Sequence, residues 1–112
     1  MNDTMDKQEY INVKDALGRL GGNRGLYTML LKRFDGYEYL ENLETSLQNG
    51  DMEKATHYAH SLKGVSANLS LGVVKDLVTE LEQLLINGGD YQVCFSSLKD
   101  ALKATMGEIE GF

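Results

Sequence analysis

The chain has 112 residues, of which 42% are hydrophobic and 25% are charged, a balance typical of one soluble domain with a single core. The formal net charge is −6 and the basic residues are scattered, which argues against nucleic-acid binding because nucleic-acid-binding domains carry a basic stripe. The single cysteine excludes an internal disulfide, and no apolar run is long enough for a membrane span or an export signal. We therefore expect one cytoplasmic domain over residues 1–112.

The spacing of the apolar residues predicts an all-α fold. Proline is absent from the chain, and apolar residues recur at intervals of three and four, as on one face of a helix. Residues 1–9 are mostly polar, and we expect them to be disordered. A short amphipathic helix is predicted over residues 11–20, where Gly21 and Gly22 end it. We expect this helix to pack across one end of the fold.

Two helices are predicted in the middle of the chain. Asn23 is a candidate N-cap for a helix that continues to about residue 47, with a bend near Gly36. The next helix is expected over residues 52–69, and Asp51 is its candidate N-cap.

Two more helices are predicted in the remaining sequence. Ser70 is expected to cap a helix that carries the strongest apolar stripe of the chain, over residues 71–85. After a second glycine-rich turn, the last helix is expected from Tyr91 to about residue 109. Long helices joined by short loops run antiparallel to their neighbours. The sequence therefore predicts an antiparallel up-down-up-down four-helix bundle with a short additional N-terminal helix.

The stretch over residues 59–69 places a histidine on the polar side of a helix. At 100° per residue, His60 points away from the apolar arc of its helix. Helical side chains lean toward the N-terminus, so Gly64 at i+4 leaves the ring uncovered, and Ala67 beyond it is compact. Lys63 at i+3 can hold an ammonium beside the ring. An exposed imidazole, largely neutral at neutral pH, next to a cation suits reaction with an anion.

Four other polar residues are weaker candidates for this site. His57 lies one turn before His60 and is either a second cation or a solvated side chain. The antiparallel return of the next helix brings Thr79, Glu82 and Gln83 level with the imidazole. For Glu82 the favoured interpretation is a solvated surface carboxylate.

The run Ala59-His60-Ser61-Leu62-Lys63-Gly64 resembles the hallmark of the histidine-containing phosphotransfer (HPt) domain, Ala-His-x-Leu-Lys-Gly followed by small residues and a leucine. Further similar stretches are Leu20-Gly21-Gly22-Asn23, Leu30-Leu31-Lys32-Arg33-Phe34, Gly50-Asp51 and Leu81-Glu82. Ser70 departs from the glycine that many members carry after the leucine, which leaves the geometry of this turn open.

This resemblance implies a phosphorelay carrier. His60 would accept a phosphoryl group from the phospho-aspartate of a response-regulator receiver domain and pass it to another receiver aspartate. Lys63 would stabilise the phosphate, Gly64 would give access, and a polar residue on the next helix, for which Glu82 is nearest, would hydrogen-bond the imidazole. The implied partners are receiver domains and a hybrid sensor histidine kinase.

The resemblance also limits what the chain itself supplies. The receiver would provide Mg²⁺, so we expect no metal site and no bound cofactor in this chain. The sequence has no P-loop glycine motif, so we expect a phosphotransfer intermediate without ATP-dependent kinase activity. We expect a monomer with no nucleic-acid or membrane partner.

Two other functions stay open. A metal-binding bundle is suggested by Glu53, His57 and His60 on one helix face, although the chain has no Glu-x-x-His pair of the di-iron type. The other is a non-catalytic helical adaptor, but an adaptor gives no reason for a glycine inside the helix beside the histidine. A metal assay and a phosphotransfer assay with a phosphorylated receiver distinguish the three.

Overall fold

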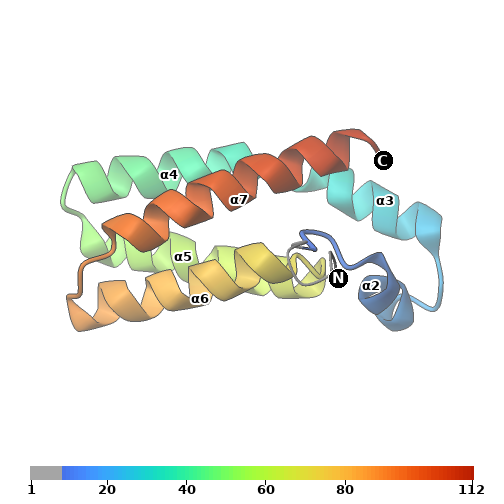
Figure 1. Cartoon of the computed structure of the whole chain (residues 1–112), viewed down its shortest axis with the longest axis horizontal. Helices are drawn as coiled ribbons and strands as arrows, with labels where there is room; N and C mark the ends of the chain where they lie inside the picture. Colours follow the sequence, from blue (N-terminus) through green and yellow to red (C-terminus); the bar gives the residue numbers. More distant parts are fainter. Residues whose placement is uncertain (1–8) are drawn as a thin grey trace, which may run out of the picture.

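The computed structural model describes residues 9–112, and all regular elements in this range are α-helices. The helices are α2 (Val13–Arg19), α3 (Arg24–Arg33), α4 (Gly36–Gln48), α5 (Met52–Asn68), α6 (Gly72–Asn87) and α7 (Gln92–Glu110) (Figure 1). The predicted all-α fold is confirmed. The expected disorder at the N-terminus falls mainly on residues 1–8, which lie outside the described residues. In the described part of the chain, no helix combines the length and apolarity needed to cross a membrane.

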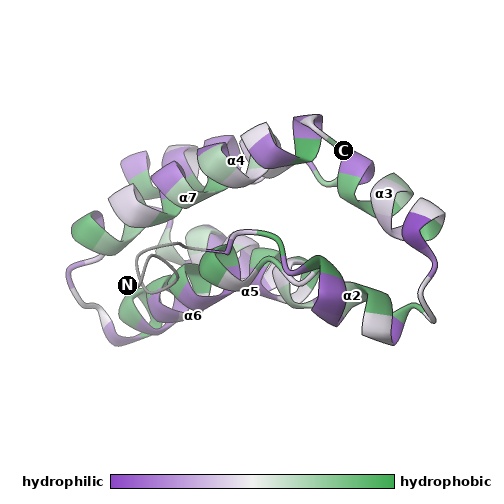
Figure 2. Cartoon of the chain, turned by 45° about the vertical axis from the view of Figure 1, so that its right-hand side comes forward, coloured by the Kyte–Doolittle hydropathy of each residue, from purple (hydrophilic) through white to green (hydrophobic). Residues whose placement is uncertain are grey.

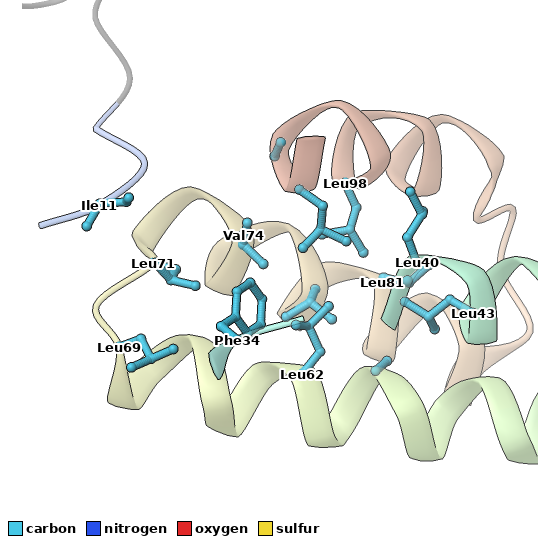
Figure 3. Packing of buried hydrophobic residues seen from close by; sticks show 14 of the residues in the cluster. Ile11, Phe34, Leu40, Leu43, Leu62, Leu69, Leu71, Val74, Leu81 and Leu98 are labelled. Atoms are coloured by element: carbon cyan, nitrogen blue, oxygen red, sulfur yellow. The ribbon is translucent and has the colours of Figure 1, made fainter. Parts of the chain in front are cut away.

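The four longer helices pack around one core. Helix α5 contacts α4 and α6, and α7 contacts the same two helices; Figure 1 shows α4 beside α7, and α5 beside α6. Hydrophilic and hydrophobic residues alternate along each helix in Figure 2, as expected for helices with one buried side. Leu43, Leu62, Leu81 and Leu98, one from each of these helices, are all fully buried in this core (Figure 3).

Two predicted N-caps are present in the structure. The Asn23 side chain accepts a hydrogen bond of 3.0 Å from the N–H of Leu26 at the start of α3. The Asp51 side chain accepts one of 3.1 Å from the N–H of Lys54 in the first turn of α5. These bonds satisfy N–H groups that have no partner within the helix. Asp51 therefore defines where the helix that carries the candidate histidine begins.

The predicted continuous helix with a bend is wrong, because α3 and α4 are separate helices. Phe34 is extended, with φ −71° and ψ 119°, and the Asp35 side chain caps α4 by accepting a 3.0 Å bond from the N–H of Glu38. Gly36 packs so closely on α7 that a Cβ there would lie 2.9 Å from the sulfur of Met106. An N-cap residue and a close contact with α7 thus replace the expected bend.

The turn between α5 and α6 also differs from the prediction. The N-cap of α6 is Leu71, without a side-chain bond, so Ser70 does not cap this helix. Ser70 has φ 59°, in the left-handed region that favours glycine. Its hydroxyl donates a 2.7 Å bond to Asp15 and accepts a 2.5 Å bond from Arg19. These two bonds to α2 offset the strain that a side chain brings to this position.

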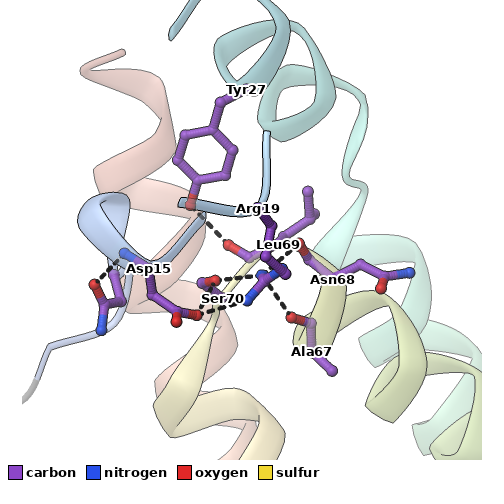
Figure 4. Close-up of polar contacts among 8 residues, drawn as sticks. Asp15, Arg19, Tyr27, Ala67, Asn68, Leu69 and Ser70 are labelled. Carbon is purple, nitrogen blue, oxygen red and sulfur yellow. Dashed lines mark hydrogen bonds and ion pairs between the residues drawn. The ribbon is translucent and has the colours of Figure 1, made fainter. Parts of the chain in front are cut away.

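Helix α2 lies across the end of α5, as the sequence predicts for the short first helix. The Arg19 guanidinium donates to the carbonyls of Ala67 at 3.0 Å and Asn68 at 2.8 Å, and the Tyr27 hydroxyl donates to the carbonyl of Leu69 at 2.7 Å (Figure 4). The last carbonyls of a helix have no partner within it. Side chains from α2 and α3 therefore complete the C-terminus of α5.

Replacing Arg19 by Met is expected to lower the free energy of unfolding by about 1–2 kcal/mol, because two carbonyls and a hydroxyl lose a charged donor. Urea unfolding followed by circular dichroism measures this change. Arg24→Met is the matched control, since Arg24 is exposed in α3 and its side chain makes no hydrogen bond with the described residues. Equal stability of the two variants would show that the cap contributes nothing.

Candidate functional site

His60 lies in the middle of α5 with its imidazole at the surface. The buried residues of this helix are Ala55, Ala59, Leu62 and Ser66, which lie on its other side. The side chain of His60 is 70% exposed, so its predicted exposure is confirmed. Its Nδ1 lies 2.9 Å from a carboxylate oxygen of α6, whereas its Nε2 makes no hydrogen bond with the described residues. One ring nitrogen is thus held and the other is open to solvent.

The carboxylate that holds the ring belongs to Glu82. One oxygen, Oε2, lies 2.9 Å from Nδ1 of His60, and the other, Oε1, accepts a 2.6 Å bond from Nζ of Lys63. The Glu82 side chain is only 8% exposed. The favoured expectation of a solvated carboxylate is therefore wrong. Glu82 follows Val78 by four residues and precedes Leu85 by three, both buried, and this helical spacing was the sequence signal for its burial.

The charge of Glu82 decides which ring nitrogen carries the proton. The hydrogen bond from Lys63 holds the pKa of Glu82 below its ordinary value against the opposing effect of burial, and His60 acts in the same direction. Glu82 is therefore a carboxylate at neutral pH and only accepts hydrogen bonds. Nδ1 of His60 must then be the protonated nitrogen, and in the neutral ring Nε2 keeps its lone pair.

The same carboxylate makes stability depend on pH. Because the pKa of Glu82 is lower in the folded state than in the unfolded state, its contribution is complete above the ordinary glutamate pKa of about 4.3. This contribution is lost as the pH falls through the folded-state value. We expect the free energy of unfolding to decrease more steeply below about pH 5 in the natural protein than in Glu82→Gln. Parallel pH profiles in urea unfolding would contradict this assignment.

Lys63 and Gly64 lie one turn after His60 in α5. The Lys63 side chain is 32% exposed, and its ammonium is bound to Glu82 instead of standing free beside the ring. Gly64 is exposed, and a Cβ at this position would have no side chain within 4 Å. An alanine methyl group would therefore not contact the imidazole in the resting protein. A longer side chain is needed to cover it.

The other predicted residues are not part of this hydrogen-bonded group. Ala67 is half-buried, and its carbonyl accepts from Arg19. The Thr79 hydroxyl donates to the carbonyl of Lys75 at 2.7 Å. Gln83 is exposed and makes no side-chain hydrogen bond with the described residues. The sequence does not indicate the role of Arg19, which donates to the last carbonyls of α5. A contact between distant parts of the chain leaves no local signal.

His57 lies in α5, one turn before His60. His57 is exposed, with its ring centroid 6.1 Å from that of Tyr58. Among residues 9–112, no three histidine, cysteine, aspartate or glutamate side chains form a group that could hold a metal ion. The face with Glu53, His57 and His60 therefore gives the metal-binding hypothesis no structural support.

Cys94 has the buried position expected for a small apolar side chain. It is 6% exposed, and its thiol donates a 3.4 Å bond to the carbonyl of Leu77. Burial raises the pKa of the Cys94 thiol, which disfavours the reactive thiolate.

An all-α domain that exposes one imidazole nitrogen and holds the other on a carboxylate has the features of a histidine phosphoacceptor protein. The family model described as "Hpt domain" matches residues 33–111. The chain therefore belongs to the Hpt domain family. It is a histidine phosphotransfer carrier of phosphorelays, in agreement with the resemblance of its sequence.

A solved structure has the same fold. The crystal structure of histidine-containing phosphotransfer protein B from Pseudomonas aeruginosa PAO1 matches with a TM-score of 0.82 and 22% sequence identity. The match covers 94% of this chain and 95% of that one, and at this identity it shows a shared fold. No curated protein sequence matches the chain.

Proposed function

We propose that His60 is the residue that carries the phosphoryl group, and that it does so on Nε2. The observation that carries this proposal is the orientation of the ring, with Nδ1 on Glu82 and Nε2 exposed. Nε2 attacks the phosphorus of a receiver phospho-aspartate. The bond from Nε2 to phosphorus forms as the phosphorus–oxygen bond breaks, and the electron pair leaves with the aspartate carboxylate. Attack by the aspartate of another receiver reverses these steps.

Three residues around His60 have supporting roles in this proposal. Glu82 positions the ring and stabilises the positive charge that the ring gains, as the carboxylate of a catalytic triad does for its histidine. Lys63 provides a cation for the phosphoryl group. Gly64 leaves the space through which the phospho-aspartate approaches, which agrees with the open surroundings of its Cα.

The remaining components would come from the partners. Receiver domains, and a hybrid sensor histidine kinase as the source of the phosphoryl group, are the proposed partners, and the receiver supplies Mg²⁺. The chain would act as a cytoplasmic monomer without a bound cofactor. We assign the four longer helices to an antiparallel up-down-up-down bundle, because short loops join consecutive helices and each contacts two others.

A partly apolar hollow is a candidate docking surface for the receiver. Leu30, Phe34 and Val65 line it together with Arg19 and Arg33, and its volume is about 490 Å³. It lies between α3 and α5, on the helix that carries His60.

Transfer between purified proteins tests this function. A receiver domain labelled with ³²P on its aspartate is mixed with the chain, and a second receiver is then added. We expect the label to move to the chain as an acid-labile phosphate and then to the second receiver. An adaptor or a metal-binding bundle would not take up the label, and the absence of uptake from every receiver of the source organism would refute the proposal.

A further inference from the structure

We propose that Lys63 exchanges its partner during the reaction. In the resting protein Lys63 is paired with Glu82, and once His60 is phosphorylated Lys63 moves to the phosphoryl group. This inference rests on the proposed function of His60. The exchange couples the role of Glu82, which holds the ring, to the role of Lys63, which binds the phosphoryl group.

The geometry supplies both the starting arrangement and the means to leave it. A single carboxylate holds both side chains, with Oε1 at 2.6 Å from Nζ of Lys63 and Oε2 at 2.9 Å from Nδ1 of His60. Glu82 is 8% exposed and fixed at the helix interface, whereas the Lys63 side chain is 32% exposed and has a flexible stem. Lys63 follows His60 by three residues, which places both on one side of α5. The ammonium can therefore move while the carboxylate stays.

The charges before and after phosphorylation favour this exchange. Nε2 attacks phosphorus through its lone pair, so the ring that reacts is neutral, and beside this neutral ring Lys63 is the cation that compensates the buried carboxylate. When Nε2 binds phosphorus, Nδ1 keeps its proton and the ring becomes cationic, so the ring itself then compensates Glu82. The phosphoryl group adds negative charge outside the ring, where it attracts an ammonium. The charged groups that act on Glu82 are Lys63 and His60, both from α5.

The exchange predicts how two substitutions combine. The natural protein gains a contact from Glu82 to the ring and one from Lys63 to the phosphoryl group, but it must first break the pair between them. Lys63→Met loses the contact with the phosphoryl group, and Glu82→Gln loses the contact with the cationic ring. Neither variant has to break the pair between Lys63 and Glu82. The double variant loses both contacts. Its effect is therefore larger than the product of the two single effects, as measured by a double-mutant cycle.

The test measures the stability of the phosphohistidine with phosphoramidate as the donor. Phosphoramidate transfers its phosphoryl group to His60 and releases ammonia. At a fixed ammonia concentration, ³¹P NMR therefore gives the equilibrium constant for phosphorylation of His60. The variants are Lys63→Met, Glu82→Gln and the double variant, with Lys54→Met as the control, because Lys54 is an exposed lysine of the same helix. We expect each single substitution to lower the constant by about threefold to tenfold. We expect the double substitution to lower it by more than the product.

Each contrary outcome refutes a different statement. If Lys63→Met raises the equilibrium constant for phosphorylation, the lysine stays on Glu82. It then only weakens the stabilisation of the cationic ring by Glu82. A double effect equal to the product, or no effect of Lys63→Met, would show that the two residues act independently. These results would overturn the exchange and leave His60 as the carrier. Failure of phosphoramidate to label His60 in the natural protein would refute the proposed function and the exchange with it.

Discussion

Gly64→Leu is expected to abolish most transfer from a phosphorylated receiver while the domain stays folded. Gly64 is exposed and a Cβ there meets nothing, so a leucine fits without disturbing the core. Its side chain leans toward the N-terminus of α5, over the imidazole at i−4. We expect the transfer rate to fall at least about hundredfold, which corresponds to a barrier increase of about 2.7 kcal/mol.

Two comparisons separate access from chemistry at this position. Gly64→Ala is expected to gain about 0.5–1 kcal/mol of stability from the higher helix propensity of alanine. Its transfer should decrease only slightly, because the methyl group does not reach the ring. Phosphoramidate is small, so it should still label Gly64→Leu far better than the receiver does. Transfer from a receiver to Gly64→Leu at the natural rate would contradict the access argument.

His60→Gln is expected to remove all phosphoryl acceptance and to leave the fold intact. The side chain is 70% exposed, so the change in unfolding free energy should stay within about 1 kcal/mol. Helix content by circular dichroism and acid-labile phosphate after incubation with a labelled receiver are the two measurements. His57→Gln is the control and should still accept phosphate, because His60 is the proposed acceptor. The ring of His57 has no carboxylate partner in the described structure. Acid-labile phosphate that persists in His60→Gln would contradict this assignment.

The fold was predictable where a local signal was enough. Asn23 and Asp51 cap the helices that they were expected to cap. The apolar spacing continues through the break between α3 and α4 and therefore predicts only a bend, because the close contact of Gly36 with Met106 is tertiary. Serine is common at N-caps, so the sequence predicts that Ser70 caps α6, whereas the N-cap is Leu71. The bonds of Ser70 to Asp15 and Arg19 arise only when α2 folds back.

The candidate site was predictable to the same extent. The exposure of His60 and the position of Lys63 follow from spacing along one helix. Glu82, the partner of both, lies at helical spacing from the buried Val78 and Leu85, but its contact with the ring depends on how closely α5 and α6 pack. The burial explains why Glu82, and not its exposed neighbour Gln83, meets the ring.

The proposed orientation of the His60 ring fixes which of its nitrogens carries the phosphoryl group. The chain is labelled with ¹⁵N in its histidines, phosphorylated with phosphoramidate and observed by NMR through the coupling between phosphorus and nitrogen. Because the Glu82 carboxylate holds the Nδ1 proton, we expect a phosphorus coupling to Nε2 of His60. Coupling to Nδ1 of His60, or to either nitrogen of His57, would contradict this expectation.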